Sequence, residues 1–200
     1  MFSNHMFGLL YDAPHEWREI RREPTETISQ VFLRHALLLA MIPPFALFVG
    51  TTQMGWSMAG GELVYLTMGS AAVIAVAFYL SLLLGLALMS FLIHAMEHVF
   101  GASVSYERCL MLTIYTASPI FLAGVAGFLP ILWLDVLVVM LAACYSLYLL
   151  FTGVPVFMDI PEERGMMFSF MVMTAGLCLL VGGMAITVIL WGVGLAPAYH

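Results

Sequence analysis

The sequence predicts an all-α membrane protein, a bundle of five transmembrane helices with a cytoplasmic N-terminus and the C-terminus outside. Of the 200 residues, 63% are hydrophobic and only 9% are charged, which is too little polar surface to coat a soluble globule. Several uncharged runs are long enough to cross a hydrocarbon core of about 30 Å. All six positive charges are arginines and form no polybasic patch, so no nucleic-acid partner is expected.

Residues 1–29 are predicted to form a cytoplasmic N-terminal segment that contains one short helix. Pro14 suits the first turn of this helix, and Trp17 and Ile20 fall three residues apart on one side. Two arrangements fit the pattern. The helix lies on the membrane surface with Trp17 in the interface, or it packs as a cap on the bundle.

The remainder, 30–200, is predicted to be one five-span membrane domain, with the first span at about 31–50 and the second at about 64–93. Thr27 followed by Gln30 forms a capping box in front of the first span. The pair Pro43-Pro44 inside this span removes two backbone donors, so we expect a bend that neighbouring protein covers.

The stretch from Leu110 to Thr152 is apolar except for Asp135 and is about twice as long as one span requires. It must therefore turn once, and Gly127-Phe128-Leu129-Pro130 is the strongest breaker within it. This places two spans at about 110–129 and 131–152. Asp159 with Glu162 forms a further capping pattern that leads into the last span, at about 167–195.

The arginines give the expected orientation. With five spans, all six fall on one side of the membrane, in the N-terminal segment, the start of the first span and the second and fourth loops. This is the positive-inside distribution, and four or six spans would break it.

The segment His94-Ala95-Met96-Glu97-His98 matches the H-x-x-E-H pattern of inverted zinc peptidases. In that pattern two histidines one turn apart bind the metal, and the glutamate activates water. Zinc at His94, Glu97 and His98 is therefore one hypothesis. The other is a polar helix end that emerges among lipid headgroups.

Asp135 is the one carboxylate within the long apolar stretch, and acidic residues inside membranes mark ion or proton paths often enough to be considered. It lies a few residues after Pro130, so it falls about one turn below the outer surface. There it serves either an ion path, together with the helix break at Pro119, or the structure alone.

Cys109, Cys144 and Cys178 lack the paired spacing of a disulfide or zinc framework, and we interpret them as small apolar packing residues. The 16 methionines are spread through the spans, and we interpret them as flexible apolar packing residues. No phosphate-binding loop, nucleophile elbow or Ser/His/Asp set is visible. We therefore expect no enzymatic activity and no cofactor, zinc being the exception considered above.

Short motifs, in a fixed order along nearly the whole chain, carry a family resemblance. They include Thr51, Thr52 and Gln53 in the segment 50–56, Tyr115, Ser118, Pro119 and Gly124 in the segment 115–124, Gly153 and Pro155, the pair Glu162-Glu163, and the segments 26–29 and 185–192. On these residues the chain resembles the Yip domain family, membrane proteins named for interacting with Ypt/Rab GTPases, and in particular its small bacterial members.

The resemblance implies a five-helix bundle in the bacterial inner membrane. Eukaryotic members of the family act in vesicle traffic and bind small GTPases and one another. We therefore expect a non-enzymatic inner-membrane protein that organises lipids or protein partners, either other membrane proteins or a second copy of itself. A small transporter or channel using Asp135, and a metal-dependent hydrolase built on His94, Glu97 and His98, are the alternatives.

Overall fold

A computed structural model describes residues 8–9, 11–22, 25–56, 63–129, 131–192 and 196–199, with the side chains of 25–35 excepted. This part of the chain is helical, with two isolated β-bridges and no strand. The capping box at Thr27 and Gln30 rests on side chains outside the described set. The side chain of Arg34, the residue Pro130 and residues 193–195 at the end of the last predicted span also lie outside the described set.

In the described part of the chain, five helices are long and apolar enough to cross a membrane, which confirms the predicted all-α fold with five spans. They are α3 (Thr25–Val49), α4 (Met68–Met96), α5 (Tyr106–Ala123), α6 (Leu132–Met158) and α7 (Glu162–Leu190), preceded by the short α2 (Ala13–Arg22). A π-helical turn, η1 (Gly50–Met54), extends α3, and 3-10 turns extend α4 and α5 as η2 (Glu97–Phe100) and η3 (Gly124–Phe128).

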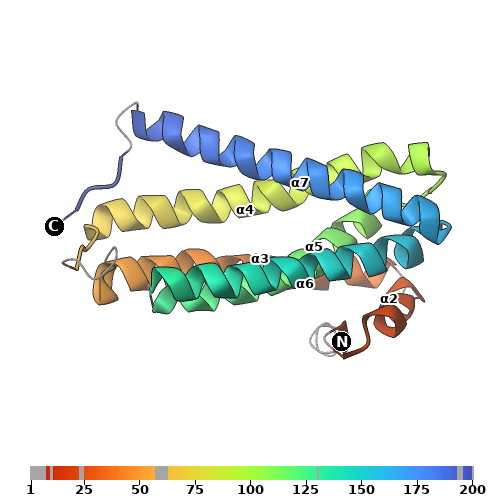
Figure 1. Ribbon diagram of the computed structural model, residues 1–200, viewed down its shortest axis with the longest axis horizontal. Helices are drawn as coiled ribbons and strands as arrows, with labels where there is room; N and C mark the ends of the chain where they lie inside the picture. Colours follow the sequence, from red (N-terminus) through yellow and green to blue (C-terminus); the bar gives the residue numbers. More distant parts are fainter. Residues whose placement is uncertain are drawn as a thin grey trace.

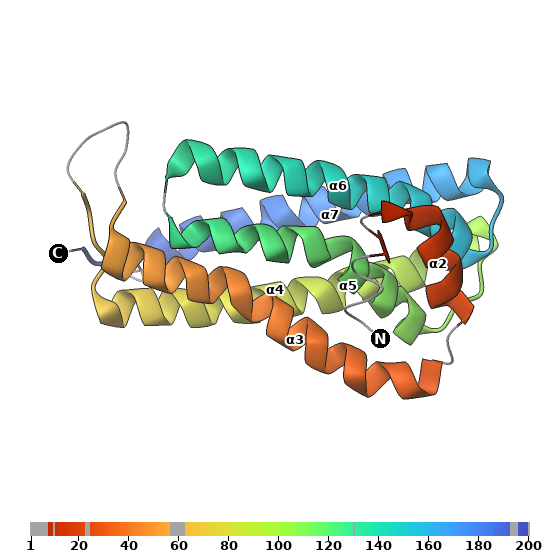
Figure 2. The same ribbon diagram turned by 90° about the horizontal axis from the view of Figure 1, so that it is seen from below.

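The helix α5 forms the centre of the bundle. It contacts α3, α4 and α6, and half of its most apolar window is buried, against less than a quarter in any other span. Figures 1 and 2 show α3, α5 and α6 side by side, while α4 and α7 lie along the opposite side and diverge towards the C-terminal end of α7. The stretch around Tyr115 is thus the core of the fold.

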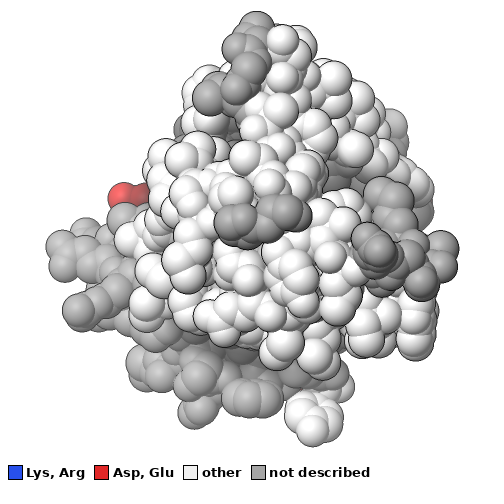
Figure 3. All heavy atoms as spheres, turned by 90° about the vertical axis from the view of Figure 1, so that its left-hand side faces the viewer, with Lys and Arg blue, Asp and Glu red and all other residues white. Residues whose placement is uncertain are grey.

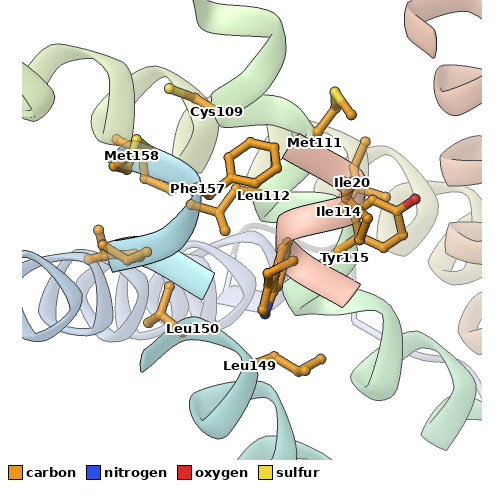
Figure 4. Close-up of a cluster of buried hydrophobic side chains, with 14 of the residues drawn as sticks. Ile20, Cys109, Met111, Leu112, Ile114, Tyr115, Leu149, Leu150, Phe157 and Met158 are labelled. Atoms are coloured by element: carbon orange, nitrogen blue, oxygen red, sulfur yellow. The ribbon is translucent and has the colours of Figure 1, made fainter. Parts of the chain in front are cut away.

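The helix α2 is anchored to this core by Trp17. The side chain of Trp17 is fully buried, and its ring meets Tyr115 of α5 and Phe157 of α6 edge-on, with centroids 5.9 Å and 5.7 Å away. Ile20 lies beside Ile114 and Tyr115 in the same cluster (Figure 4). Of the two arrangements considered, α2 therefore adopts the one packed on the bundle.

The two prolines of α3 face the bundle, where Pro44 is buried. The direction of α3 changes along its length (Figure 2), as expected when prolines remove backbone hydrogen bonds. A Cβ at Gly124 would lie 2.8 Å from Cα of Pro43, so only glycine lets the end of α5 approach the bent helix this closely.

The described arginines gather at one end of the bundle, which we call the arginine end. It is formed by α2, the α4–α5 connection and the α6–α7 connection, and it carries Arg18, Arg21, Arg22, Arg108 and Arg164. The opposite end shows no basic atom and only a small acidic patch among the atoms described there (Figure 3).

The predicted cap at Asp159 is wrong in its role. The helix α7 begins at Glu162 with Pro161 at its N-cap, whereas Asp159 ends α6 in the left-handed conformation, with φ of 57°. Its carboxylate instead forms an ion pair with Arg21 of α2, with Nη2 and Oδ2 2.7 Å apart. Arg21 also donates to the carbonyl of Val156, 3.0 Å away, so it ties α2 to the end of α6.

This ion pair makes part of the stability pH-dependent. The hydrogen bond and charge of Arg21 lower the pKa of Asp159. Because the pKa is depressed in the folded state, the pair stabilises the protein above the unfolded value of about 3.9 and is lost as the pH falls through the folded value. Asparagine tolerates positive φ, so Asp159→Asn keeps the backbone conformation. The substitution should lower the melting temperature at neutral pH but not at the lowest pH the protein withstands.

The measurement is thermal unfolding of both proteins across the acidic range. Glu163, an exposed carboxylate in the first turn of α7, supplies the control Glu163→Gln. A difference between Asp159→Asn and wild type that stays constant through the acidic range would contradict the assignment of that difference to the ion pair.

Candidate functional site

A groove of about 410 Å³ runs between α4, α5, α6 and α7 at the depth of the membrane spans. We call it the lateral groove. Its wall is almost entirely apolar and includes Met89 of α4, Thr116 of α5, Ala143 and Ser146 of α6, and Gly176 and Leu180 of α7. Because every residue of its wall lies within a candidate membrane span, lipid is the solvent that surrounds it.

Two hydroxyl groups in this wall have no hydrogen-bond partner. They are Oγ1 of Thr116 and Oγ of Ser146, and both atoms are buried. Two other hydroxyls of α5 bond back to their own helix, Thr113 to the carbonyl of Cys109 at 2.8 Å and Ser118 to that of Ile114 at 2.7 Å. Neither oxygen is accessible from the groove in this conformation, so each could bind a polar atom of an occupant only after its side chain changes rotamer.

The glutamate of the H-x-x-E-H segment is buried near the arginine end, with its side chain only 1% exposed. Its Oε1 lies 3.3 Å from Nδ1 of His94 and 3.8 Å from Nε2 of His98, and its Oε2 accepts the backbone N–H of Val104 at 2.8 Å. Glu97 therefore fixes the backbone of the α4–α5 connection at Val104 and faces both imidazoles.

The structure adds to this cluster a residue whose sequence context predicts only a packing role. Cys109, in the first turns of α5, is fully buried, and donor atoms of His94, Glu97 and Cys109 lie within 4.8 Å of one another. His98 is outside this set, and its side chain is 73% exposed. No sequence spacing indicates the approach of Cys109, because the turn at Gly101, with φ of 79°, creates it.

A polar cavity of about 410 Å³ lies at the arginine end, lined by Arg21, Arg108, Asp159 and the residues of the α4–α5 connection. Arg108 donates to the backbone carbonyl of Arg21 at 3.2 Å. Both arginines thus bond to groups of the protein itself, and these bonds connect α2 to α5 and α6 beside the cavity.

The residues of the suggested ion path lie apart from both cavities. Asp135 is in the first turn of α6, where its backbone N–H bonds to the carbonyl of Ile131 at 3.0 Å, and its Oδ1 is buried without a hydrogen-bond partner. Pro119 lies inside α5. Neither residue lines the lateral groove or the polar cavity.

Several of the motif residues make close packing contacts between elements. A Cβ at Gly153 would lie 2.6 Å from Cε2 of Trp17, and one at Gly165 would lie 2.6 Å from Cγ of Pro155. These glycines let α2 and α7 approach α6. Tyr115 meets the ring of Trp17, as described above.

The hydroxyl-bearing motif residues bond to their own helices. Ser118 donates to the carbonyl of Ile114 at 2.7 Å, Thr51 to that of Leu47 at 2.8 Å and Thr52 to that of Phe48 at 2.6 Å. Gln53 is exposed in η1. The motif residues thus position helices. Thr116 of the groove wall falls within the motif segment 115–124, whereas Ser146 and Gly176 are functional candidates that the motifs do not mark.

Five apolar helices in the described part of the chain, of which α5 is the buried central one, define the class of this protein, a helical multi-pass membrane protein. Residues 7–183 match the model of the Yip1 domain, and the chain belongs to that family. It is 38% identical, over 191 residues, to "Inner membrane protein YohC" of Escherichia coli K12, covering 96% of this chain and 97% of that protein.

The protein of the same name from Escherichia coli O6:H1 (strain CFT073) gives the same identity and coverage. No solved structure matches the chain. The family membership and the five spans together place the protein in the bacterial inner membrane as a multi-pass protein.

Proposed function

We propose that the protein is a non-enzymatic organiser of membrane lipid that holds one lipid chain in the lateral groove. The observation that carries this proposal is the groove itself, an apolar volume of about 410 Å³ between four spanning helices. A volume of this size lies within the range of ligand sites in proteins. At this depth the molecules available to fill it are lipids.

Retention of a lipid here depends on fit. Lipid tails are as apolar as leucine, so a chain moving from bulk lipid into the groove gains no hydrophobic free energy. It gains dispersion contacts with the wall and, if it carries an oxygen at the right depth, a hydrogen bond to Thr116 or Ser146. Lipids with such an oxygen should therefore be enriched among those retained.

The alternatives receive less support from the same geometry. A transporter or channel needs a water path to its ionisable group, whereas Asp135 lines neither of the two cavities described above. A hydrolase needs a glutamate that reaches water beside an external substrate, whereas Glu97 is 1% exposed and bonds the backbone of Val104.

The orientation proposed for this function places the arginine end in the cytoplasm. The gathering of the described arginines at that end supports it, as does the lack of basic atoms among those described at the opposite end (Figure 3). A chain in the groove would then contact α5, the central helix, and bias the packing of α4 and α7 around it.

Native mass spectrometry of the purified protein tests the proposal. We expect a stoichiometric lipid to remain bound after detergent exchange that strips annular lipid, and we expect no ion or solute flux in liposomes. A protein that emerges free of lipid, or one that conducts, would overturn the proposal.

A further inference from the structure

We propose that His94, Glu97 and Cys109 form a binding site for a soft divalent cation of the zinc class. The site differs from the sequence hypothesis in its third ligand, because Cys109 takes the place of His98. It is also independent of the lateral groove, which His94, Glu97 and Cys109 do not line.

The first argument is the burial of the Glu97 carboxylate. Among the described residues, its partners within ion-pair distance are the imidazoles of His94 and His98, at 3.3 Å and 3.8 Å. A buried carboxylate is costly unless a cation or several hydrogen bonds compensate it. A divalent cation beside Oε1 would supply that compensation.

The second argument is an unused donor atom. Nδ1 of His94 is buried and makes no hydrogen bond, although it lies 3.3 Å from Oε1 of Glu97. The two atoms approach without the geometry of a hydrogen bond. Two ligands of one metal ion stand in this relation, since each directs its lone pair at the ion rather than at the other ligand.

The third argument is the chemistry of the donor set. The donor atoms of His94, Glu97 and Cys109, one nitrogen, one oxygen and one sulfur, lie within 4.8 Å of one another. Zinc binds these three atom types at about 2.0–2.3 Å, which puts neighbouring ligand atoms roughly 3.5 Å apart in a tetrahedron. Calcium and magnesium take oxygen ligands, so the thiol selects against them.

Occupation of this site would connect three elements. His94 lies at the end of α4, Glu97 in η2 and Cys109 in α5, so one ion would fix the α4–α5 connection at the arginine end. Glu97 already holds this connection through Val104, and the ion would add its binding free energy to that of the folded state.

Cobalt substitution tests the site in the full-length protein in detergent. Wild type should bind one equivalent of Co²⁺ and show a thiolate-to-cobalt charge-transfer band, and Zn²⁺ should displace it and raise the melting temperature. Cys109→Ser should lose the band and weaken Zn²⁺ binding at least tenfold. Cys144→Ser and Cys178→Ser, which change exposed thiols, should behave as wild type.

His94→Gln keeps the proposal testable should Cys109→Ser fail to fold, because the side chain of His94 is partly exposed and its loss leaves the core intact. It too should weaken Zn²⁺ binding at least tenfold. No cobalt band in wild type, a band that survives in Cys109→Ser, or unchanged affinity in His94→Gln would each overturn the proposal.

Discussion

Replacing Trp17 with alanine is expected to cost about 3–5 kcal/mol of unfolding free energy, the range for removal of a fully buried large aromatic side chain. Trp17 has no exposed surface and meets both Tyr115 and Phe157, so its loss leaves a cavity where α2 meets α5 and α6. Thermal unfolding in detergent, and limited proteolysis of the N-terminal segment, measure the effect. The segment should become readily cleaved.

Trp133→Ala is the matched control, because Trp133 is 69% exposed at the start of α6 and should cost little. A second comparison uses Gly153→Ala, which forces a Cβ against the Trp17 ring and should cost about 1–3 kcal/mol. That cost should vanish in the Trp17→Ala background, because the clash partner is gone. Additive effects of the two substitutions would contradict the packing described here.

Gly176→Leu is expected to expel the lipid from the lateral groove and leave the fold intact. A Cβ at Gly176 would meet nothing nearer than Cε of Met89, 3.8 Å away across the groove, so the larger side chain grows into the space that we assign to the lipid. The lipid retained in native mass spectra should fall at least fivefold, or about 1 kcal/mol of binding free energy.

Gly183→Leu, two turns further along α7, controls for the same chemical change. A Cβ there meets nothing within 4 Å and lies outside the groove, so the variant should keep the lipid. Both substitutions share the gain in helix propensity from removing glycine, which leaves the groove as the difference between them. Equal lipid retention in the two variants would count against the lateral groove as the binding site.

The number of spans and the element order could be predicted from the sequence, because both depend on local properties. Long uncharged runs, the breaker before Pro130 and the arginine spacing each determine a boundary without reference to distant residues. The relative placement of the spans could not be predicted. Membrane helices that are apolar all round carry no periodicity that says which face turns inward.

The candidate sites show the same division. His94 and Glu97 are adjacent in sequence and could be singled out, whereas Cys109 reaches them only through the turn at Gly101. The capping role predicted for Asp159 is wrong because a capping pattern is local, while the partner of Asp159 in the structure, Arg21, is 138 residues away. The groove depends on how α7 diverges from α4, which no single segment encodes.

The most direct test of the central claim is photo-crosslinking with a phospholipid that carries a diazirine in its acyl chain, followed by mapping of the adducts. Annular lipid reaches only the outward faces of the bundle, whereas a chain in the lateral groove reaches the face of α5 that lines it, at Leu112, Thr113 and Thr116. We predict adducts on that face in wild type and their loss in Gly176→Leu. Adducts confined to outward positions, such as Leu137, Met140 and Val188, would contradict the account.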